Sequence, residues 1–194
     1  MISREYRVFL RQWMKNPMGI GAVAPSSRRL ADAMARQVPT HGIGPVIELG
    51  GGTGNITAGL LRAGIAPSRL VVVERDPALH RLLQHRYPRL RVVEGDAAAL
   101  VACLRPLGIH RADAIVSGLP LLTIPRDIQD AIVREVFALL APGSPFIQFT
   151  YGPYSPVERE RLGVSGKVAK WVAGNFPPAS VWVYRRGGDS AQVR

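Results

Sequence analysis

The sequence predicts one α/β domain built on a mostly parallel sheet with helices on both faces. Three observations lead to this prediction. Short, β-rich apolar runs alternate with helix-like segments from residue 46 onward, a glycine-rich turn directly follows the first run, and the last two runs lie close enough to form an antiparallel hairpin. With 194 residues, 47% of them hydrophobic and 20% charged, the chain has ordinary globular composition and enough length for one sizeable core.

The strand and helix candidates can be placed in chain order. The strands are expected at 46–49, 70–74, 91–94, 113–117 and 145–151. The helices are expected at 54–64, 77–86, 97–106 and 126–141, the last opened by Pro125 and closed by "APG". A loop rich in Pro, Gly and Ser follows, and then "KVAKWVAGN" and "SVWVYRR" form the hairpin before a frayed tail.

The first 44 residues form a segment of a different kind. Residues 2–16 predict an amphipathic helix with an apolar face beside a basic one, and Pro17 ends it. After the hinge "GIGAVAPSS", Ser26 or Ser27 is the expected N-cap of a second helix through "RRLADAMARQV". We therefore divide the chain into an extension, 1–44, and a main domain, 45–188.

Composition narrows the possible partners and cofactors. A net charge of +11 favours a polyanionic partner, either nucleic acid or an anionic membrane face. Cys103 is the single cysteine, and the four histidines are scattered, so we expect neither a disulfide nor a metal site. No apolar run approaches the length of a transmembrane helix or a signal-peptide core, and a cytoplasmic protein is expected.

The stretch "VIELGGGTGN" predicts a ligand-binding turn between the first strand and the first helix of the main domain. Gly50, Gly52 and Gly54 permit a sharp turn and a close approach of the backbone to a ligand, and Asn55 begins a helix whose N–H groups are free. No Lys-Ser or Lys-Thr follows, so a phosphate loop is disfavoured. The acid just before the glycines, Glu48, suits a cationic ligand.

Two further acids end the second and third strands. Glu74, followed by Arg75, stands where a ribose-binding carboxylate is expected, and Asp96, followed by Ala97, stands where an adenine amino group could be held. Either acid alone could be a solvated loop residue. Together they predict one crevice at the carboxyl edge of the sheet, to which Ser117 at the end of the fourth strand and Ser26 or Ser27 would also contribute.

"ELGGGTG", "VVVERDP" and "EGDA" resemble the first three motifs of the Rossmann-like class of S-adenosylmethionine-dependent methyltransferases. The resemblance covers residues 46 to about 150. It implies a class I methyltransferase fold with seven strands, the last of them antiparallel, and S-adenosylmethionine as the cofactor.

The loop after the fourth strand, "SGLPLL", bears on the methyl acceptor. Enzymes of this class that methylate adenine or glutamine amides carry Asn or Asp and an aromatic residue around the proline. Here Gly118 and Leu121 take those places, which disfavours a stacked base.

"FLRQWMKNPMGIGAVAPSS", "SGLPLL" and "QFTYGPYSP" together resemble the bacterial phospholipid N-methyltransferases over nearly the whole chain. That resemblance implies methylation of phosphatidylethanolamine towards phosphatidylcholine at the membrane surface. We further expect a monomer at the inner face of the cell membrane, with anionic lipids as partners and no nucleic acid. The extension would then dock the enzyme. The expected membrane-binding residues are Arg4, Arg7, Phe9, Leu10, Arg11, Trp13 and Lys15.

The expected catalytic residues surround the same loop. Backbone carbonyls of Ser117, Gly118 and Leu119 and the hydroxyl of Tyr151 would orient the acceptor amine, while Pro120 fixes the loop. Tyr151 is the best candidate for a general base, with a water relay equally acceptable. Two rival hypotheses remain: an enzyme similar to the ribosomal RNA adenine dimethyltransferases, and a module that binds cofactor or membrane without catalysis.

Overall fold

The computed structural model describes residues 27–175 and 177–187 and contains a seven-stranded sheet. Its strand order is β3-β2-β1-β4-β5-β7-β6; β1 to β5 are parallel, and β7 pairs antiparallel with both β5 and β6. The strands are β1 (Val46–Leu49), β2 (Leu70–Glu74), β3 (Arg91–Glu94), β4 (Ala114–Ser117), β5 (Phe146–Tyr151), β6 (Val164–Val172) and β7 (Ala179–Arg186). The predicted fold class, sheet and C-terminal hairpin are confirmed.

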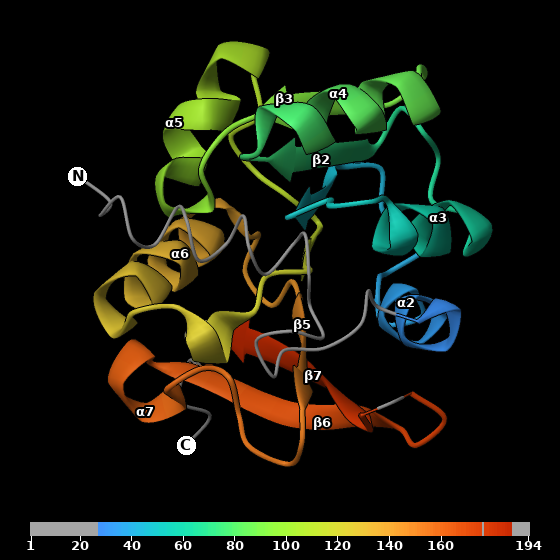
Figure 1. The fold of residues 1–194 in the computed structure, drawn as a ribbon. Coiled ribbons are helices and arrows are strands. Elements are labelled where there is room, and N and C mark those ends of the chain that lie inside the picture. The colour runs from blue at the N-terminus through green and yellow to red at the C-terminus, as the bar shows by residue number, and fades with distance from the viewer. Residues whose placement is uncertain (1–26, 176, 188–194) are drawn as a thin grey trace.

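Helices cover both faces of this sheet (Figure 1). One face carries α2 (Arg28–Ala35), α3 (Asn55–Arg62) and α4 (Pro77–Arg86). The other carries α5 (Leu100–Leu104) and α6 (Arg126–Leu139), and α7 (Arg159–Leu162) lies beside α6 and β6. Three short 3₁₀ turns complete the set: η1 (Ala97–Ala99), η2 (Arg105–Leu107) and η3 (Leu121–Thr123).

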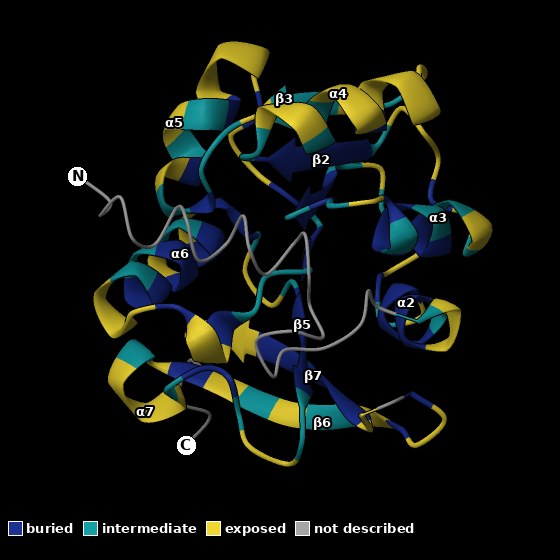
Figure 2. Ribbon diagram, viewed as in Figure 1, coloured by how far each residue is buried: buried dark blue, intermediate teal, exposed yellow. Residues whose placement is uncertain are grey.

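The core consists of two apolar layers, one on each face of the sheet. Alternating side chains of β1 divide between them: Ile47 and Leu49 pack towards α5 and α6, and Val46 packs towards α2 and α3. All four residues of β1, β4 and most of β5 are buried, as is usual for strands covered on both sides. Figure 2 shows the buried strands between helices whose outer turns are exposed.

Several predicted boundaries were wrong by a few residues. The helix expected at 97–106 is interrupted: Asp96 caps a 3₁₀ turn before α5, and a second 3₁₀ turn containing Pro106 follows it. Asp113 directly precedes β4, and its carboxylate accepts a hydrogen bond from Gly44 N–H (2.7 Å) and pairs with Arg69 (3.2 Å). The loop expected after Tyr151 contains the short α7.

The predicted second helix is present as α2, and Ser27 is its N-cap, with the Ser27 hydroxyl accepting from Leu30 N–H (3.2 Å). It ends at Ala35 rather than at residue 38. The helix expected at 2–16, the hinge and Ser26 lie outside the described residues. Within the described part of the chain, no helix is both long and apolar enough to cross a bilayer.

Candidate active site

The glycine-rich turn has the backbone geometry that its sequence predicts. Gly50, Gly52 and Gly54 adopt positive φ angles of 70°, 54° and 85°, where side chains other than hydrogen are strained. Gly50 N–H donates to the carbonyl of Val73 (2.8 Å), which ties the start of the turn to β2. The turn then leads directly into α3, whose N-cap is Gly54.

Two residues from the end of α4 hold the far side of this turn. The Tyr87 hydroxyl donates to the carbonyl of Gly54 (3.0 Å), and Arg86 Nη1 donates to the carbonyl of Thr53 (2.9 Å). The sequence analysis missed both contacts, because they join residues 33 positions apart and no local pattern marks them.

Glu48 is fully buried beneath the turn, on the face that carries α3. Its Oε2 accepts a hydrogen bond from the Thr57 hydroxyl (2.7 Å), whereas Oε1 has no partner within the part of the chain that the structure describes. Burial raises the pKa of Glu48 to about 8, even though the hydrogen bond from Thr57 opposes the shift. A nearby positive charge would favour ionisation, so this carboxyl group suits a cationic ligand.

Glu74 is fixed at the end of β2, next to the glycines. Its Oε2 accepts from Gly52 N–H (2.9 Å) and its Oε1 accepts from Asp76 N–H (2.8 Å). The carboxylate is almost fully buried, yet each oxygen can accept a further hydrogen bond. It is therefore oriented by the turn and able to accept from hydroxyl groups of a ligand.

Asp96 and Arg75, both expected to bind the cofactor, contact each other. Arg75 Nη1 lies 3.3 Å from Asp96 Oδ2, and Asp96 Oδ1 accepts from Ala98 N–H (2.9 Å). Ala97 is buried directly after this cap. The structure therefore brings the ends of β2 and β3 together, with Asp96 held in place and its side chain 28% exposed.

The loop after β4 lies against the glycine turn. Gly118 N–H donates to the carbonyl of Leu49 (2.8 Å), and a Cβ atom at Gly50 would lie 2.7 Å from Leu119 Cδ2. The hydroxyl of Ser117 is fully buried and accepts from Leu119 N–H (3.2 Å). The Ser117 hydroxyl therefore shapes this loop from beneath, while Gly118 and Leu119 lie directly over the turn.

Gln148 of β5 completes the support of this loop. Its Nε2 donates to the carbonyl of Leu119 (2.9 Å), and its Oε1, also buried, has no partner among the described residues. A glutamine inside the apolar strand "FIQFTY" is a signal that the sequence analysis could have used. A buried amide in such a run needs hydrogen-bonding partners, and here they lie in the acceptor loop.

Tyr151 lies at the end of β5, half-buried and edge-to-face against Phe149, with ring centroids 5.3 Å apart. Burial raises the pKa of the Tyr151 hydroxyl to about 12, and a hydrogen bond involving Asn175 offsets part of that shift. The group is therefore a neutral phenol near pH 7. It can orient an amine by hydrogen bonding, but a neutral phenol is a weak proton acceptor.

The structure thus brings together most of the residues expected at the site, from the ends of β1, β2, β3 and β4. Asn55 follows Gly54 at the start of α3, and Pro120 leads into η3 beside the same loop. Ser27 is the N-cap of α2, and its role in cofactor binding stays a prediction. No cluster of three or more potential metal ligands occurs among the residues described.

Comparison with known proteins agrees with this geometry. Residues 46–143 match the family model described as "Methyltransferase domain". Over 185 residues the chain is 34% identical to the ornithine lipid N-methyltransferase of Singulisphaera acidiphila, covering 94% of this chain and 96% of the relative. It is 31% identical over 144 residues to the ribosomal RNA small subunit methyltransferase A of a Synechococcus species, covering 73% of this chain but 44% of that longer protein.

Among solved structures, the fold is similar to the N-methyltransferase NodS from Bradyrhizobium japonicum in complex with S-adenosyl-L-homocysteine. The TM-score is 0.70 at 15% sequence identity, over 96% of this chain and 100% of NodS.

Proposed function

Because the chain belongs to the methyltransferase domain family and has the S-adenosylmethionine-dependent fold, we propose that it methylates the amine of a membrane amino lipid. The observation that carries this proposal is the 34% identity to an ornithine lipid N-methyltransferase over nearly the full length of both chains. Phosphatidylethanolamine, favoured by the sequence motifs, and an ornithine lipid, favoured by this relative, are the two candidate acceptors. Both offer a primary amine on a lipid headgroup.

The residues present fit S-adenosylmethionine. The glycine turn leaves no side chain between the backbone and a ligand, Glu74 offers oriented acceptors for ribose hydroxyls, and the unpartnered Oε1 of Glu48 suits a positive group. When bound, S-adenosylmethionine would supply an electrophilic methyl group on a sulfonium. Asp96 and Ala97 would lie beside the adenine.

The acceptor must reach the site as a neutral amine. A primary ammonium similar to that of lysine has a pKa of about 10.4, so only about one molecule in a thousand is neutral at pH 7. Desolvation in the loop region lowers that pKa. The amine would donate hydrogen bonds to the backbone carbonyls of Gly118 and Leu119, and the hydroxyl of Tyr151 would help to orient it. Water would carry its proton away.

Exposed apolar side chains beside the acceptor loop support a lipid substrate. Leu122, in η3 after β4, is 53% exposed, and Tyr154, in the loop after β5, is 77% exposed. Because β4 and β5 are parallel neighbours, both side chains follow the same edge of the sheet. Apolar groups at that edge favour contact with the boundary between headgroups and acyl chains.

The extension supports the same proposal from the sequence. Four basic residues near an anionic leaflet contribute on the order of 4 kcal/mol of attraction, at about 1 kcal/mol each. With Phe9, Leu10 and Trp13 on the apolar face, residues 2–16 would hold the enzyme reversibly at the inner face of the membrane.

A methyl-transfer assay tests the proposed acceptor. Purified protein is incubated with labelled S-adenosylmethionine and, in separate reactions, vesicles containing phosphatidylethanolamine, vesicles containing ornithine lipid, or ribosomal RNA. We expect label in at least one amino lipid and none in the RNA, with Glu74→Gln as the control that weakens cofactor binding. Labelled ribosomal RNA with unlabelled lipids would contradict the proposal and favour the RNA hypothesis, and cofactor binding without any labelled product would favour the non-catalytic one.

A further inference from the structure

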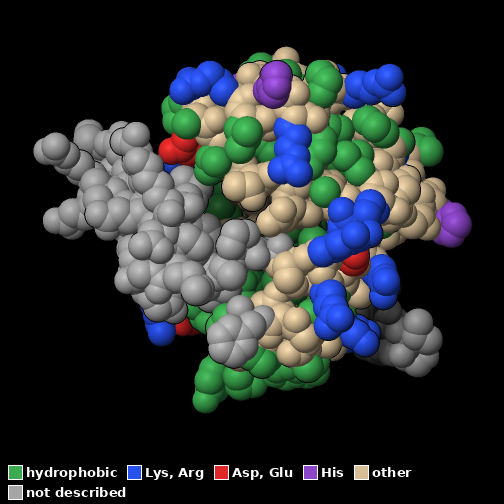
Figure 3. All heavy atoms as spheres, turned by 45° about the vertical axis from the view of Figure 1, so that its right-hand side comes forward, with side chains coloured by type: hydrophobic (Ala, Val, Ile, Leu, Met, Phe, Trp, Pro, Cys, Tyr) green, Lys and Arg blue, Asp and Glu red, His purple; other side chains and the backbone are tan. Residues whose placement is uncertain are grey.

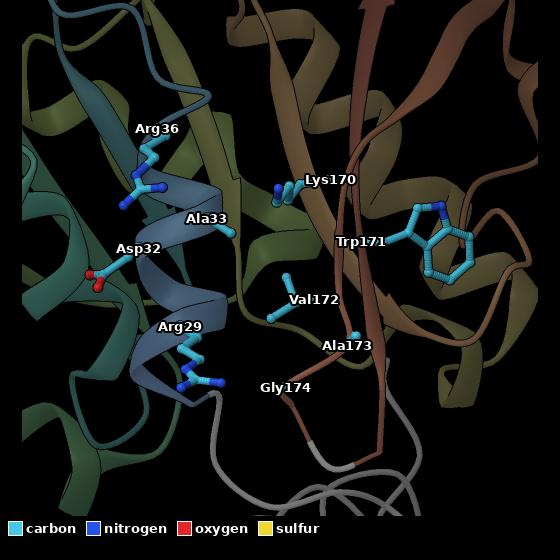
Figure 4. A pocket seen from close by; sticks show the side chains of 9 residues that line it. All are labelled: Arg29, Asp32, Ala33, Arg36, Lys170, Trp171, Val172, Ala173 and Gly174. Carbon is cyan, nitrogen blue, oxygen red and sulfur yellow. The ribbon is translucent and has the colours of Figure 1, made fainter.

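A groove of about 290 Å³ separates α2 from the edge strand β6 and the turn that follows it. Ala33 of α2 and Val172 of β6 form part of its apolar floor, and Arg29, Arg36 and Lys170 surround it. Figure 4 shows Lys170 and Val172 on the side of β6 that faces α2. The groove is thus lined by apolar side chains and edged by cations from two different elements.

These three cations have no ion-pair partner in the part of the chain that the structure describes, and all three are exposed. Arg29 and Arg36 are seven residues apart, so they share a face of α2 about 10 Å apart along its axis. Lys170 faces them from β6. Three like charges around one groove repel each other unless an anion lies between them.

Asp32, the acidic residue among those that line the groove, is already paired. Asp32 points away from β6 (Figure 4), and its Oδ1 lies 2.5 Å from Arg62 Nη2 of α3, with Arg28 at 3.9 Å from Oδ2. Figure 3 shows Lys and Arg side chains gathered on the face where α2 and α3 lie, with little acidic surface between them. The electrostatic field over the groove is therefore positive.

One end of the groove lies at the edge of the sheet that carries the candidate active site. Tyr151, at the carboxyl end of β5, pairs with Ala179 at the start of β7, so the β6–β7 turn lies at that edge. Arg29 lies against this turn, since a Cβ atom at Gly174 would lie 2.3 Å from Arg29 Nη1. A flat anionic surface that contacts the groove would therefore also approach the acceptor loop.

Trp171 gives this region an apolar side chain suited to a bilayer. Trp171 is 51% exposed, and its side chain turns away from the groove (Figure 4). Lys170 and Trp171 extend from opposite faces of one edge strand, so a bilayer that meets this edge can contact both, with the ring in the headgroup boundary and the ammonium at phosphate. A lysine on an edge strand also discourages strand pairing between molecules, but that role does not account for Arg29 and Arg36.

We propose that the α2–β6 groove is a docking surface for the phosphate groups of an anionic bilayer, separate from the N-terminal extension. Arg29, Arg36 and Lys170 would contact lipid phosphates, and Trp171 would insert from the other face of the β6 edge. The inference rests on the proposed lipid function for its biological purpose, but its test does not need methyl transfer.

The test measures binding of the full chain to vesicles of phosphatidylglycerol and phosphatidylcholine, which contain no primary amine, without S-adenosylmethionine. The groove variant is Arg29→Gln, Arg36→Gln, Lys170→Gln. The matched control, Arg81→Gln, Arg89→Gln, Arg91→Gln, removes the same charge from exposed positions on α4 and around β3, at the opposite edge of the sheet. None of these three has an ion pair among the described residues. Each cation at the membrane surface should contribute about fivefold to the vesicle affinity. We therefore expect the dissociation constant to rise about 100-fold in the groove variant and less than about threefold in the control.

A second measurement locates the contact. The three tryptophans are Trp13, Trp171 and Trp182, and Trp182 is buried. In the Trp13→Phe variant we expect anionic vesicles to shift the fluorescence to shorter wavelength through Trp171, and brominated lipids to quench it. The shift should vanish when Trp171→Phe is added.

Equal loss of vesicle binding in the groove and control variants would mean attraction by net charge alone and would overturn the proposal. Unchanged binding in the groove variant, or no fluorescence change in Trp13→Phe, would overturn it as well. These results are separate from the proposed function. Vesicle binding through the groove without lipid methylation would refute only the proposed function. Lipid methylation together with unchanged vesicle binding by the groove variant would refute only the proposed docking surface.

Discussion

The buried carboxyl of Glu48 predicts an unusual dependence of stability on pH. Its pKa is about 8 in the folded chain, against an ordinary value of 4.5, so the folded state binds more protons than the unfolded state between these values. The free energy of unfolding should therefore fall as pH rises through this range. The variant Glu48→Gln keeps the size of the side chain and removes the titration.

The two pKa values set the size of the effect. Between about pH 5.5 and about pH 7.5, linkage predicts that wild type loses about 2–3 kcal/mol of stability relative to Glu48→Gln. The full difference between the neutral and ionised forms is about 5 kcal/mol, reached above about pH 8.

Urea unfolding at several pH values measures this difference directly. The control is Glu160→Gln, which removes an exposed carboxylate of α7 that has no ion pair among the described residues and should leave the slope unchanged. A difference between wild type and Glu48→Gln that stays constant with pH would refute the reasoning. It would mean that Glu48 is ionised or solvated in the folded chain.

Three further predictions concern the site and the extension. Gly50→Ala forces a side chain into a positive φ angle and against Leu119, so calorimetry should show S-adenosylmethionine affinity about 30-fold weaker, from about 2 kcal/mol of strain. The control Gly143→Ala, strained in the same way but in an open turn, should keep that affinity. Tyr87→Phe removes the hydrogen bond to Gly54, which contributes about 1 kcal/mol, and should raise the KM for S-adenosylmethionine about fivefold without changing kcat. A change in kcat alone would contradict the assigned role. Glu substitutions throughout the basic face of the extension should abolish vesicle sedimentation with cofactor affinity retained, and unaltered sedimentation would disprove the docking role. The substituted residues are Arg4, Arg7, Arg11 and Lys15.

The sequence predicted the sheet well because its signals are local. Each parallel strand is a short apolar run, and β1, β2 and β3 begin and end at the predicted residues. The 97–106 segment was harder, since its apolar pattern is helical throughout. Pro106 and the cap at Asp96 divide that segment. Capping depends on the hydrogen bond of one side chain, which the periodicity of apolar residues does not show.

Within the candidate site, the sequence located the strand ends but not the contacts between them. The sequence predicted that Glu48 and Glu74 contribute to the site, because Glu48 lies in the first strand just before the glycines and Glu74 ends the second strand. The pairing of Arg75 with Asp96 and the donation from Gln148 to the Leu119 carbonyl depend on which strands become neighbours and which way each side chain turns. Neither follows from spacing along one chain, because strand order is a property of the packed sheet.

The strand order also bears on how the enzyme comes together. β1 lies between β2 and β4, and β3 pairs with β2, so the loops after these four strands converge into the candidate site only after the strands have paired. A partly folded chain therefore has no intact binding place for S-adenosylmethionine, which will select the finished sheet. At 100 times its dissociation constant such a ligand adds about 2.7 kcal/mol. The methyl donor thus also stabilises the folded state, and in cells that lack it the enzyme would be more sensitive to proteases.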